Sequence, residues 1–562
     1  MIFAALVMHL SVSWQDFSTL AKNGYLYDDS FYAFQISRNI AEGRGPTFDG
    51  VTPTNGFQPL YVYLLVPAYK LFGSDQIAPI YAALTLMALL TAATAVLLIL
   101  IARRYVSDGV ALAAASLWVF SPVVVRQAAN GLETALALFL IALSIYYYLS
   151  RVRSNPDAGY GRFFKMGLLL GLAILARVDG ILFVLVMALD FLLVIRRRAK
   201  DDGTKVKLRG VFVTAATAFL IYLPWVVYGL VAVGRLLPES GAATRFLSIA
   251  YAPFFGLGGT DLLENGPSPS FVWAHVVHAA SVLKMSPPVH VLYRVVEKIG
   301  GSAPTAGTLL VLVNVMGWAT LAAFGIWWGR CRRSLEKYKR GELTFLLMFS
   351  LLLIAAYSTY VFGVFFFTRY FYPVFFVATI FAACVIQDVV DLVRRRQMFV
   401  RAAAIFVFGL YAVGLVYMGL NSSFRSAPVY HFYDVARWVE QNTSENETIG
   451  VFQGGAIGYF SRRQVVNLDG KVNGAALEAL KRGDIGGYIE EVGIDVVMDH
   501  QSVLDLFLGP YNDAAIAGLA ATKCFNGASV GAMGWVGFRV DNPGVEGAGA
   551  PSGASVKMIQ IR

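Results

Sequence analysis

The sequence predicts a polytopic α-helical membrane protein with about eleven transmembrane helices, followed by a C-terminal soluble α/β domain. The 562 residues are 57% hydrophobic and 15% charged, whereas about 25% of the residues of an ordinary soluble chain are charged. Apolar runs recur up to residue 420, and basic residues gather between them. Beyond residue 420 the long apolar runs stop. We therefore expect a membrane domain over residues 1–420 and a soluble domain over 421–562.

A helix that crosses the hydrocarbon core needs about 20 apolar residues. The candidate spans are 1–12, 78–102, 108–126, 131–150, 163–178, 180–196, 210–233, 306–328, 343–366, 371–391 and 400–420. The first of these is short for a span. No cleavable signal pattern with a small-residue cleavage site stands out at the N-terminus.

Basic clusters between the spans predict the orientation of the chain. They are Arg103-Arg104, Arg151 to Arg153, Arg196 to Lys200, Arg330 to Arg333 and Arg394 to Arg396. Cytoplasmic loops carry an excess of Lys and Arg, and placing every cluster inside makes the spans alternate without contradiction. The net charge of +10 is thus explained by topology, and we expect no nucleic-acid partner because the basic residues form no single patch. The tail after residue 420 is then extracytoplasmic.

The tail has the periodicities of a small α/β domain. Residues 433–441 follow the 3.6-residue period of a helix, and residues 448–452, 465–468 and 495–498 are short β-branched or apolar runs bounded by Gly, Asn and Asp. Gly454 to Gly458 lacks the spacing of a nucleotide-binding loop, which favours a turn. The Gly-rich stretch 544–553 predicts a flexible linker before a last short strand.

The predicted topology gathers four polar stretches on the outer face. They are an outer loop of about residues 13–59, the turn 126–134, the turn 177–180 and a loop of about residues 234–305. Asp28 and Asp29 lie in the first stretch, and ionisable groups beside a bilayer usually serve chemistry or transport. Convergence of acids and arginines on one face predicts a site there.

The motifs in these stretches resemble the GT-C superfamily of membrane glycosyltransferases. They are Tyr27-Asp28-Asp29-Ser30-Phe31-Tyr32, Asn39, Gly43-Arg44-Gly45, Thr54 to Leu60, Asn130 to Thr134, Gly171 to Gly180, Leu237 to Ser240 and Thr368 to Phe371. The resemblance is greatest to the branch of the mycobacterial terminal arabinofuranosyltransferase, and it covers residues 1–390 better than the tail.

The resemblance implies an inverting glycosyltransferase in the bacterial inner membrane. Its donor would be a polyprenyl-phosphate sugar, either a pentofuranose or a hexopyranose, and its acceptor a hydroxyl of a cell-envelope glycan or lipid on the outer face. The family places an acidic residue of the first outer loop at the acceptor hydroxyl, which favours Asp28 as the base. A lipid-linked glycan ligase is the alternative. A secondary transporter is a weaker one, because transporters show repeated halves and broken helices at the midplane.

The chemistry of sugar transfer explains these residue types without reference to a family. The reaction needs a carboxylate to accept the acceptor's proton and cations to stabilise the departing phosphate. Asp28 and Asp29 supply the first requirement, one of them facing the reaction and the other orienting the acceptor. Both acids could instead cap a helix that starts at Ser30.

Arginines and acids on the same face are the other candidate substrate ligands. Arg245 and Arg369 could grip the donor phosphate, because guanidinium offers a bidentate fork, although Arg369 could also snorkel to the interface. Arg177 and Asp179 could contact substrate or pair with each other. Glu133 could bind substrate or complement a helix dipole.

Three polar residues of the first loop complete the candidate set. Asn55, Gln58 and Tyr32 could bind sugar hydroxyls, while Asn55-Gly56 could equally form a turn. The six histidines predict no metal site, and no other cofactor is expected, although a carboxylate cluster can recruit a divalent cation.

Overall fold

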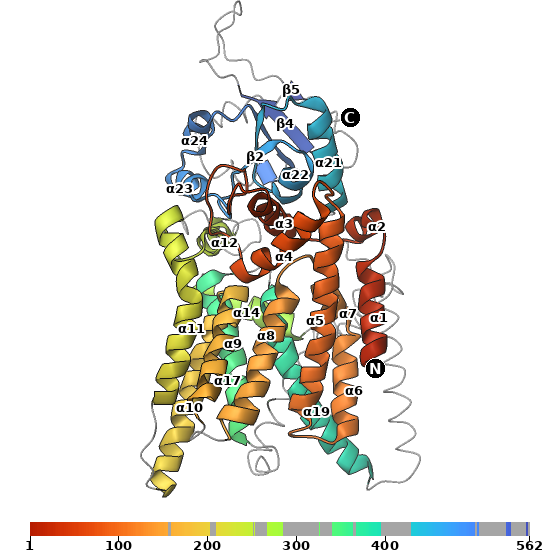
Figure 1. The fold of residues 1–562 in the computed structure, drawn as a ribbon, viewed down its shortest axis with the longest axis vertical. Helices are drawn as coiled ribbons and strands as arrows, with labels where there is room; N and C mark the ends of the chain where they lie inside the picture. Colours follow the sequence, from red (N-terminus) through yellow and green to blue (C-terminus); the bar gives the residue numbers. More distant parts are fainter. Residues whose placement is uncertain are drawn as a thin grey trace, which may run out of the picture.

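A computed structural model describes residues 1–154, 159–202, 209–250, 252, 267–284, 325, 340–362, 367–394, 429–500, 503–504, 535–540 and 558–559. These residues form a bundle of long apolar helices with a sheet-containing unit at one end (Figure 1). The predicted spans 306–328 and 400–420 and the predicted domain boundary near residue 420 lie outside the described residues. The count of eleven spans and the domain boundary therefore stay predictions.

The bundle is built from helices that follow the apolar runs of the sequence. They are α1 (Ile2–Ser13), α5 (Ala78–Ala102), α6 (Asp108–Val119), α7 (Pro122–Ala128), α8 (Thr134–Tyr147), α9 (Tyr160–Ala176), α10 (Gly180–Asp202), α11 (Arg209–Tyr228), α17 (Arg340–Ala356) and α19 (Tyr372–Arg394). Short π-helical segments continue α8, α11 and α17, namely η1 (Tyr148–Val152), η2 (Gly229–Val233) and η4 (Tyr357–Val361).

Five stretches in the described part of the chain are long and apolar enough to cross a membrane. A sixth is obtained if α6 and α7, which meet at a bend of 60°, count as one span. The helix α1 has 12 residues, too few for a full crossing at 1.5 Å per residue. The described fold is thus that of a polytopic helical membrane protein.

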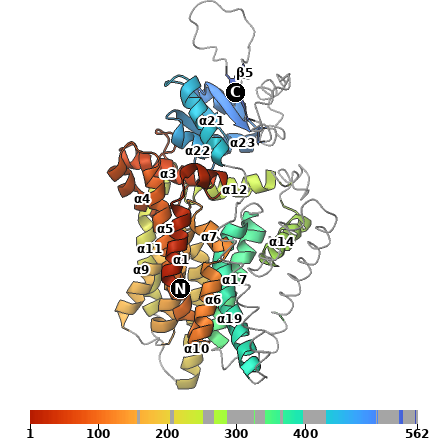
Figure 2. The ribbon, with the colours of Figure 1, turned by 90° about the vertical axis from the view of Figure 1, so that its right-hand side faces the viewer.

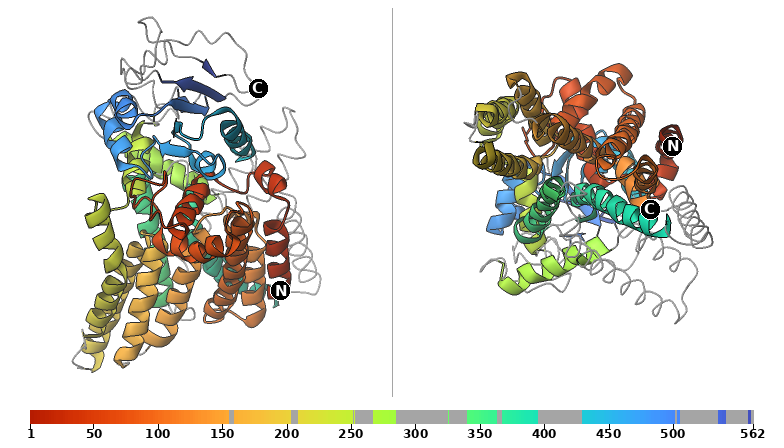
Figure 3. Two further views of the ribbon diagram at one scale, coloured as in Figure 1. Left: turned by 45° about the horizontal axis from the view of Figure 1, so that its top comes forward. Right: turned by 90° about the horizontal axis from the view of Figure 1, so that it is seen from below.

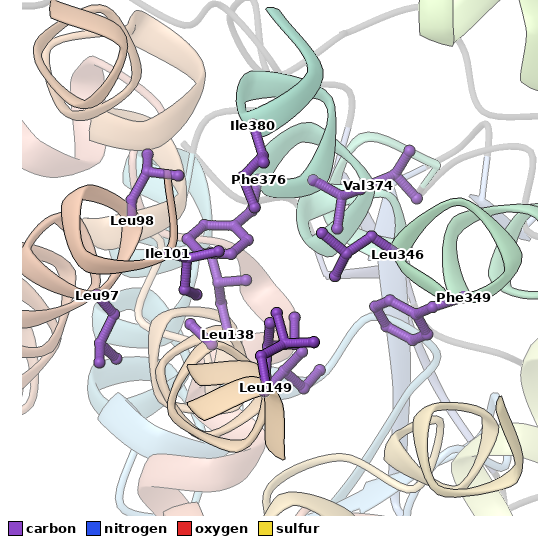
Figure 4. Packing of buried hydrophobic residues seen from close by; sticks show 14 of the residues in the cluster. Leu97, Leu98, Ile101, Leu138, Leu149, Leu346, Phe349, Val374, Phe376 and Ile380 are labelled. Carbon is purple, nitrogen blue, oxygen red and sulfur yellow. The ribbon is translucent and has the colours of Figure 1, made fainter. Parts of the chain in front are cut away.

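The centre of the bundle is held by close packing of aliphatic and aromatic side chains. Figure 4 shows Leu98 and Ile101 of α5, Leu138 of α8, and Phe376 and Ile380 of α19 in one buried cluster. Because lipid tails are as apolar as these side chains, helix association in a membrane depends on packing and on buried polar contacts rather than on escape from water. Good packing here fixes the helix ends on which the site is built.

Two buried ion pairs join neighbouring helices at the end of the bundle opposite the sheet. Arg104 pairs with Glu342 at 2.8 Å, and Arg153 pairs with Asp190 at 2.7 Å. Tyr105 also donates to Glu342 at 2.9 Å. Charges inside a membrane bundle are costly unless they are paired. Arg104 and Arg153 belong to two of the predicted cytoplasmic clusters. These two clusters thus lie at the end of the bundle away from the polar motifs.

The C-terminal unit contains a five-stranded sheet in the order β2-β1-β3-β4-β5. Its strands are β1 (Thr448–Val451), β2 (Gln464–Asn467), β3 (Val496–His500), β4 (Trp535–Arg539) and β5 (Met558–Ile559). The first three strands are parallel, with Ile449 opposite both Val465 and Val496. The strand β4 pairs antiparallel with β3, and β5 pairs antiparallel with β4. The helices between them are α22 (Gly455–Phe460), α23 (Gly474–Arg482) and α24 (Ile485–Val492), and α21 (Val429–Asn442) precedes β1.

Short helices of the outer loops lie between the bundle and this unit (Figures 1 and 2). They are α2 (Phe17–Lys22), α3 (Asp28–Ala41), α4 (Pro59–Phe72) and α12 (Glu239–Ala250). Phe31 of α3 packs against Tyr459 and Phe460 of α22, with ring centroids 5.7 and 5.3 Å apart. The left view of Figure 3 shows the sheet at one end of the bundle. The first turn of α3 consequently lies inside the molecule, at the junction.

Candidate active site

The acid pair occupies the first turn of α3. The helix begins at Asp28, with Tyr27 as its N-cap residue, so the helix does not start at Ser30 as the capping alternative supposed. Acids in a first turn complement the helix dipole. The two carboxylates nevertheless reach to other elements, and each meets a different chemical environment.

Asp28 binds the N-terminus of α22. Its carboxylate accepts the N–H groups of Gly455 at 3.1 Å and Ala456 at 2.8 Å. A Cβ on Gly455 would lie 2.2 Å from the backbone oxygen of Asp28, so only glycine permits this approach. Burial raises the pKa of Asp28 to about 8, although the two N–H bonds favour the ionised form. Asp28 therefore joins the membrane part of the chain to the C-terminal unit.

The turn that follows β1 is surrounded by acceptors. The five consecutive N–H groups of residues 452–456 all donate to side chains. Asp499 accepts the first two at 3.0 and 2.8 Å, the Tyr32 hydroxyl accepts the third at 3.1 Å, and Asp28 accepts the last two. Asn467 donates to the same hydroxyl at 3.1 Å. Only residues 452–454 form a turn, and Gly455 to Gly458, predicted as a turn, begin the helix α22. The N–H groups of residues 452–456 are bound by the protein's own side chains.

Asp29 lies between two cations. Its Oδ1 is 3.2 Å from Lys471 Nζ, and its Oδ2 is 3.3 Å from Arg369 Nη1. Burial acts to raise the pKa of Asp29, but the charges of Lys471 and Arg369 outweigh it and hold that pKa below its usual value. The side chain keeps 20% of its surface exposed. Asp29 is therefore an ionised carboxylate with two cationic neighbours.

A second cluster surrounds Arg177 at the ends of α9 and α10. Arg177 pairs with Asp179 at 2.9 Å and with Glu133 at 3.5 Å. It also donates to the Tyr357 hydroxyl at 2.9 Å, and that hydroxyl donates in turn to Asp179. The predicted pairing of Arg177 with Asp179 is present, and Glu133 joins it. Tyr357 begins the π-helical segment η4, a type of distortion that is frequent at functional sites.

Tyr370 connects the two clusters. The guanidinium carbons of Arg177 and Arg369 each lie 5.4 Å from the centroid of its ring. The ring also stacks on Tyr357, with centroids 4.2 Å apart. The Arg177 cluster thereby contacts Arg369 through the Tyr370 ring.

The remaining sequence-predicted ligands lie in other contacts. Arg245 donates to the backbone oxygen of Tyr360 at 2.6 Å and covers the ring of that residue. Gln58 is half-buried and is the N-cap residue of α4.

Asn55 joins the first loop to the segment that precedes α12. The side chain is 1% exposed. Its amide donates to the backbone oxygens of Arg235 and Leu237 and accepts the N–H of Glu239 at 3.0 Å. Asn55 and Gly56 do not form the local turn that was the alternative to sugar binding; the Asn55 side chain instead joins two segments that are distant in the sequence.

The carboxylate pair is a poor match for a divalent cation. Within the described ranges, no three His, Cys, Asp or Glu side chains gather closely enough to hold a metal ion. Mg²⁺ and Ca²⁺ take six or more oxygen ligands, whereas Asp28 is engaged by N–H donors and Asp29 by two cations. His275, considered above with the other histidines, bonds to the backbone oxygen of Phe271. We derive no metal-dependent step.

Sequence reasoning missed Lys471, Asp469, Tyr357 and Tyr370. Lys471 and Asp469 belong to the polar run Asn467 to Asn473, which begins where β2 ends. Ligand sites in open α/β sheets lie outside the carboxyl ends of parallel strands. The segments that follow β1 and β2 contact the start of α3 through Ala456 and Lys471, and Asp499 of β3 binds the turn after β1. A polar run directly after a strand was the available signal.

Comparisons with known proteins agree with this arrangement. Residues 53–228 match the family described as dolichyl-phosphate-mannose-protein mannosyltransferase. Residues 423–542 match a domain of unknown function, DUF8728. No curated protein matches the sequence.

Solved structures of an archaeal enzyme share the fold. The oligosaccharyltransferase of Archaeoglobus fulgidus in its apo form is 15% identical, with a TM-score of 0.54 over 92% of this chain and 71% of that one. AglB of the same organism, in complex with an inhibitory peptide and a dolichol-phosphate, is 16% identical, with a TM-score of 0.52 over 92% and 72% of the two chains. ArnT from Cupriavidus metallidurans, bound to undecaprenyl phosphate, covers 91% and 94% at 16% identity, but its TM-score of 0.41 supports no argument.

These similarities confirm a polytopic helical membrane fold and leave the branch open. Nothing in them points to the arabinofuranosyltransferase branch that the motifs resemble. The chain has the polytopic helical fold of the archaeal oligosaccharyltransferase, and residues 53–228 match the mannosyltransferase family.

Proposed function

We propose that this protein transfers a sugar from a polyprenyl-phosphate donor to a hydroxyl group of an acceptor. The observation that carries the proposal is Asp29, an ionised carboxylate held between Arg369 and Lys471 where the helix bundle meets the C-terminal unit. The fold likeness to an archaeal enzyme whose structure holds a dolichol-phosphate supports this type of donor. The mannosyltransferase match of residues 53–228 supports transfer of a sugar.

The site provides both groups that the reaction needs. The acceptor oxygen forms a bond to the anomeric carbon, and the bond between that carbon and the phosphate oxygen breaks with inversion. The acceptor's proton passes to Asp29, and the phosphate leaves with the electron pair. Arg369 stabilises the charge that grows on the phosphate, because a guanidinium fork matches phosphate oxygens.

We assign the base to Asp29 rather than to Asp28. Asp28 accepts two N–H groups of α22, and its pKa of about 8 keeps it largely protonated at neutral pH. A protonated carboxyl cannot accept the acceptor's proton. Asp29 is ionised and partly exposed. Asp28 then has the task of holding α22 against the first turn of α3.

The Arg177 cluster acts as a support in this proposal. Arg177 is 8% exposed and neutralised by Asp179 and Glu133, so it has little capacity left for a donor phosphate. Its contact with Tyr370 orders the residue next to Arg369. Arg177, Asp179 and Glu133 are thus positioning residues, and Tyr32 orders the turn 452–454.

The wider setting follows the resemblance described above. We place the site on the extracytoplasmic face of a bacterial inner membrane, because two of the basic clusters, those of Arg104 and Arg153, lie at the opposite end of the bundle. The donor sugar is a pentofuranose or a hexopyranose, and the acceptor is a cell-envelope glycan or lipid. Membrane lipids surround the bundle.

The test is transfer by purified protein in detergent or nanodiscs. The donors are polyprenyl-phosphate pentofuranoses, polyprenyl-phosphate hexoses and a lipid-linked oligosaccharide, and the readouts are released polyprenyl phosphate and glycosylated product. Turnover with a single-sugar donor supports the proposal. Turnover with the oligosaccharide donor alone identifies a ligase, and movement of donor without release of polyprenyl phosphate identifies a transporter.

A further inference from the structure

The turn between β2 and α23 presents a lysine to the site. Gly470, at φ +78°, separates Asp469 from Lys471, and a Cβ there would lie 2.5 Å from the Cβ of Leu477. Asp469 is 1% exposed and accepts both the backbone N–H of Lys471 at 2.9 Å and its ammonium group at 3.2 Å. The turn therefore fixes the direction of the Lys471 side chain.

The first outer loop presses on the same turn. A Cβ on Gly56 would lie 1.9 Å from the backbone oxygen of Lys471. On the other side of this contact, Glu239 accepts the Thr54 hydroxyl at 2.6 Å, and Asn55 accepts the Glu239 N–H. The backbone of Lys471 thus packs against Gly56 of the first loop. Its ammonium group lies between the carboxylates of Asp29 and Asp469.

The groups around Asp29 carry charges of both signs. The charged or titratable groups that face it are Asp28 on its own helix, Lys471 and Asp469 from the turn after β2, Arg369 from α18 (Phe367–Tyr370) and the Tyr32 hydroxyl. Lys471 and Arg369 are the two cations among these groups, and Lys471 contacts both Asp29 and Asp469. Removal of Lys471 would leave a buried acid in excess, a costly arrangement at low dielectric.

We propose that Lys471 is a positioning residue of the transfer reaction, which holds Asp29 ionised and directed at the acceptor hydroxyl. The C-terminal unit, matched only to a domain of unknown function, thereby completes the active site instead of merely covering it. The inference rests on the proposed function and extends it to a residue outside the membrane bundle. The pair itself joins residues 442 positions apart.

The first test is kinetic, with Lys471→Gln, Lys471→Arg and the control Lys481→Gln, an exposed lysine of the same unit that pairs with Glu478. An opposite charge at this distance lowers a carboxyl pKa by about 1 to 3 units. The acid limb of K471Q should therefore lie about one unit higher than that of the wild type, and its kcat should be about tenfold lower at pH values below both limbs. K471R should recover most of the activity, and K481Q should match the wild type.

Two results would overturn the role. The first is a K471Q enzyme with the kcat and pH profile of the wild type. The second is a K471Q enzyme whose donor KM rises while its acid limb stays in place, because that pattern identifies a direct donor contact. If K471Q folds poorly, the Asp469→Asn/Lys471→Gln double variant removes the excess buried acid and gives the same readout.

The second test does not depend on activity. A double-mutant cycle of Asp29→Asn and Lys471→Gln, measured by thermal unfolding, should show effects that are not additive, because residues in direct contact couple. Additive effects would overturn the inference. A coupled pair in a protein without any transfer activity would leave the contact intact and refute the proposed function instead.

Discussion

Lys471 Nζ lies 3.2 Å from Oδ1 of Asp29, although 442 positions separate the two residues. The neighbouring acid, Asp28, makes its contacts with the N–H groups of α22. One turn of helix thus carries two carboxylates with opposite electrostatic surroundings. The C-terminal unit supplies the N–H groups at Asp28 and one of the two cations at Asp29, so the division of roles between the two acids depends on how that unit docks.

Asn substitutions should separate the two acids. Asp29→Asn keeps the shape of the side chain but removes the base, and general-base catalysis contributes about 10² to 10⁴-fold. We therefore expect the kcat of D29N, measured at saturating donor and acceptor, to fall by about 10² to 10⁴-fold. Asp28→Asn should mainly lower thermal stability, because its amide NH₂ group faces an N–H donor. A D28N enzyme that is stable but inactive, beside an active D29N enzyme, would restore the role that the family resemblance implies.

The pH dependence of the rate provides an independent distinction. Because the pKa of Asp29 is lowered, kcat/KM should stay level on the acid side until the pH falls below about 4. If Asp28 were the base, the rate would instead rise with pH up to its pKa of about 8. A profile between pH 4.5 and 9 decides between these curves.

The pKa of Asp28 also predicts how stability changes with pH. Its folded value of about 8 exceeds the unfolded value of about 3.9. Its stabilising contribution is therefore complete below about pH 4 and is lost as the pH rises through 8. We expect the Tm of the wild type to fall between pH 5 and 9 more steeply than the Tm of D28N. Parallel curves would show that Asp28 keeps an ordinary pKa.

Arg369 and Arg245 should differ in their effect on turnover. Arg369 contacts Asp29 at 3.3 Å, whereas Arg245 binds the backbone of Tyr360. Loss of a group that stabilises transition-state charge typically costs about 10² to 10³-fold in kcat. We expect such a loss for Arg369→Ala, partial recovery for Arg369→Lys because the fork is missing, and a smaller loss for Arg245→Ala. Equal losses would place Arg245 at the donor phosphate, as its charge and position first suggested.

Chelators should leave the transfer rate unchanged. The donor atoms of Asp28 and Asp29 already bind N–H groups and two cations. Activity in EDTA is compared with activity in added Mg²⁺ or Mn²⁺, with donor and acceptor held constant. Loss in EDTA and recovery with one of these ions would show that the acid pair rearranges around a metal.

The orientation of the chain is open to chemical labelling. In a background with Cys331, Cys384 and Cys524 replaced by Ser, Cys replaces Glu445, an exposed residue of the C-terminal unit. It should react with an impermeant thiol reagent in intact cells. Cys at exposed Asp108, which pairs with Arg103 of a predicted cytoplasmic cluster, should react only after lysis. The reverse pattern would put the site on the cytoplasmic face.

The sequence by itself determined the helices and the residues that form one side of the site. The predicted span 78–102 coincides with α5, and the predicted strand 448–452 overlaps β1 (Thr448–Val451). Both are local features, because an apolar run or an alternating pattern carries its own periodicity. The alternation of the predicted spans also placed the four polar stretches on the same face of the membrane. Asp29 and Arg369, for example, meet as their predicted membrane depth suggested.

Only the tertiary structure decided which acid faces which partner. The run Asn467 to Asn473 shows that a polar turn follows β2, but its residue types do not reveal that Lys471 reaches Asp29. Nor does the motif around Asp28 and Asp29 contain any trace of α22. Such contacts depend on the docking of elements hundreds of residues apart, where glycines at 56 and 455 permit backbones to meet. Charge and hydrogen bonding act through distance in space, and the order of residues along the chain does not specify that distance.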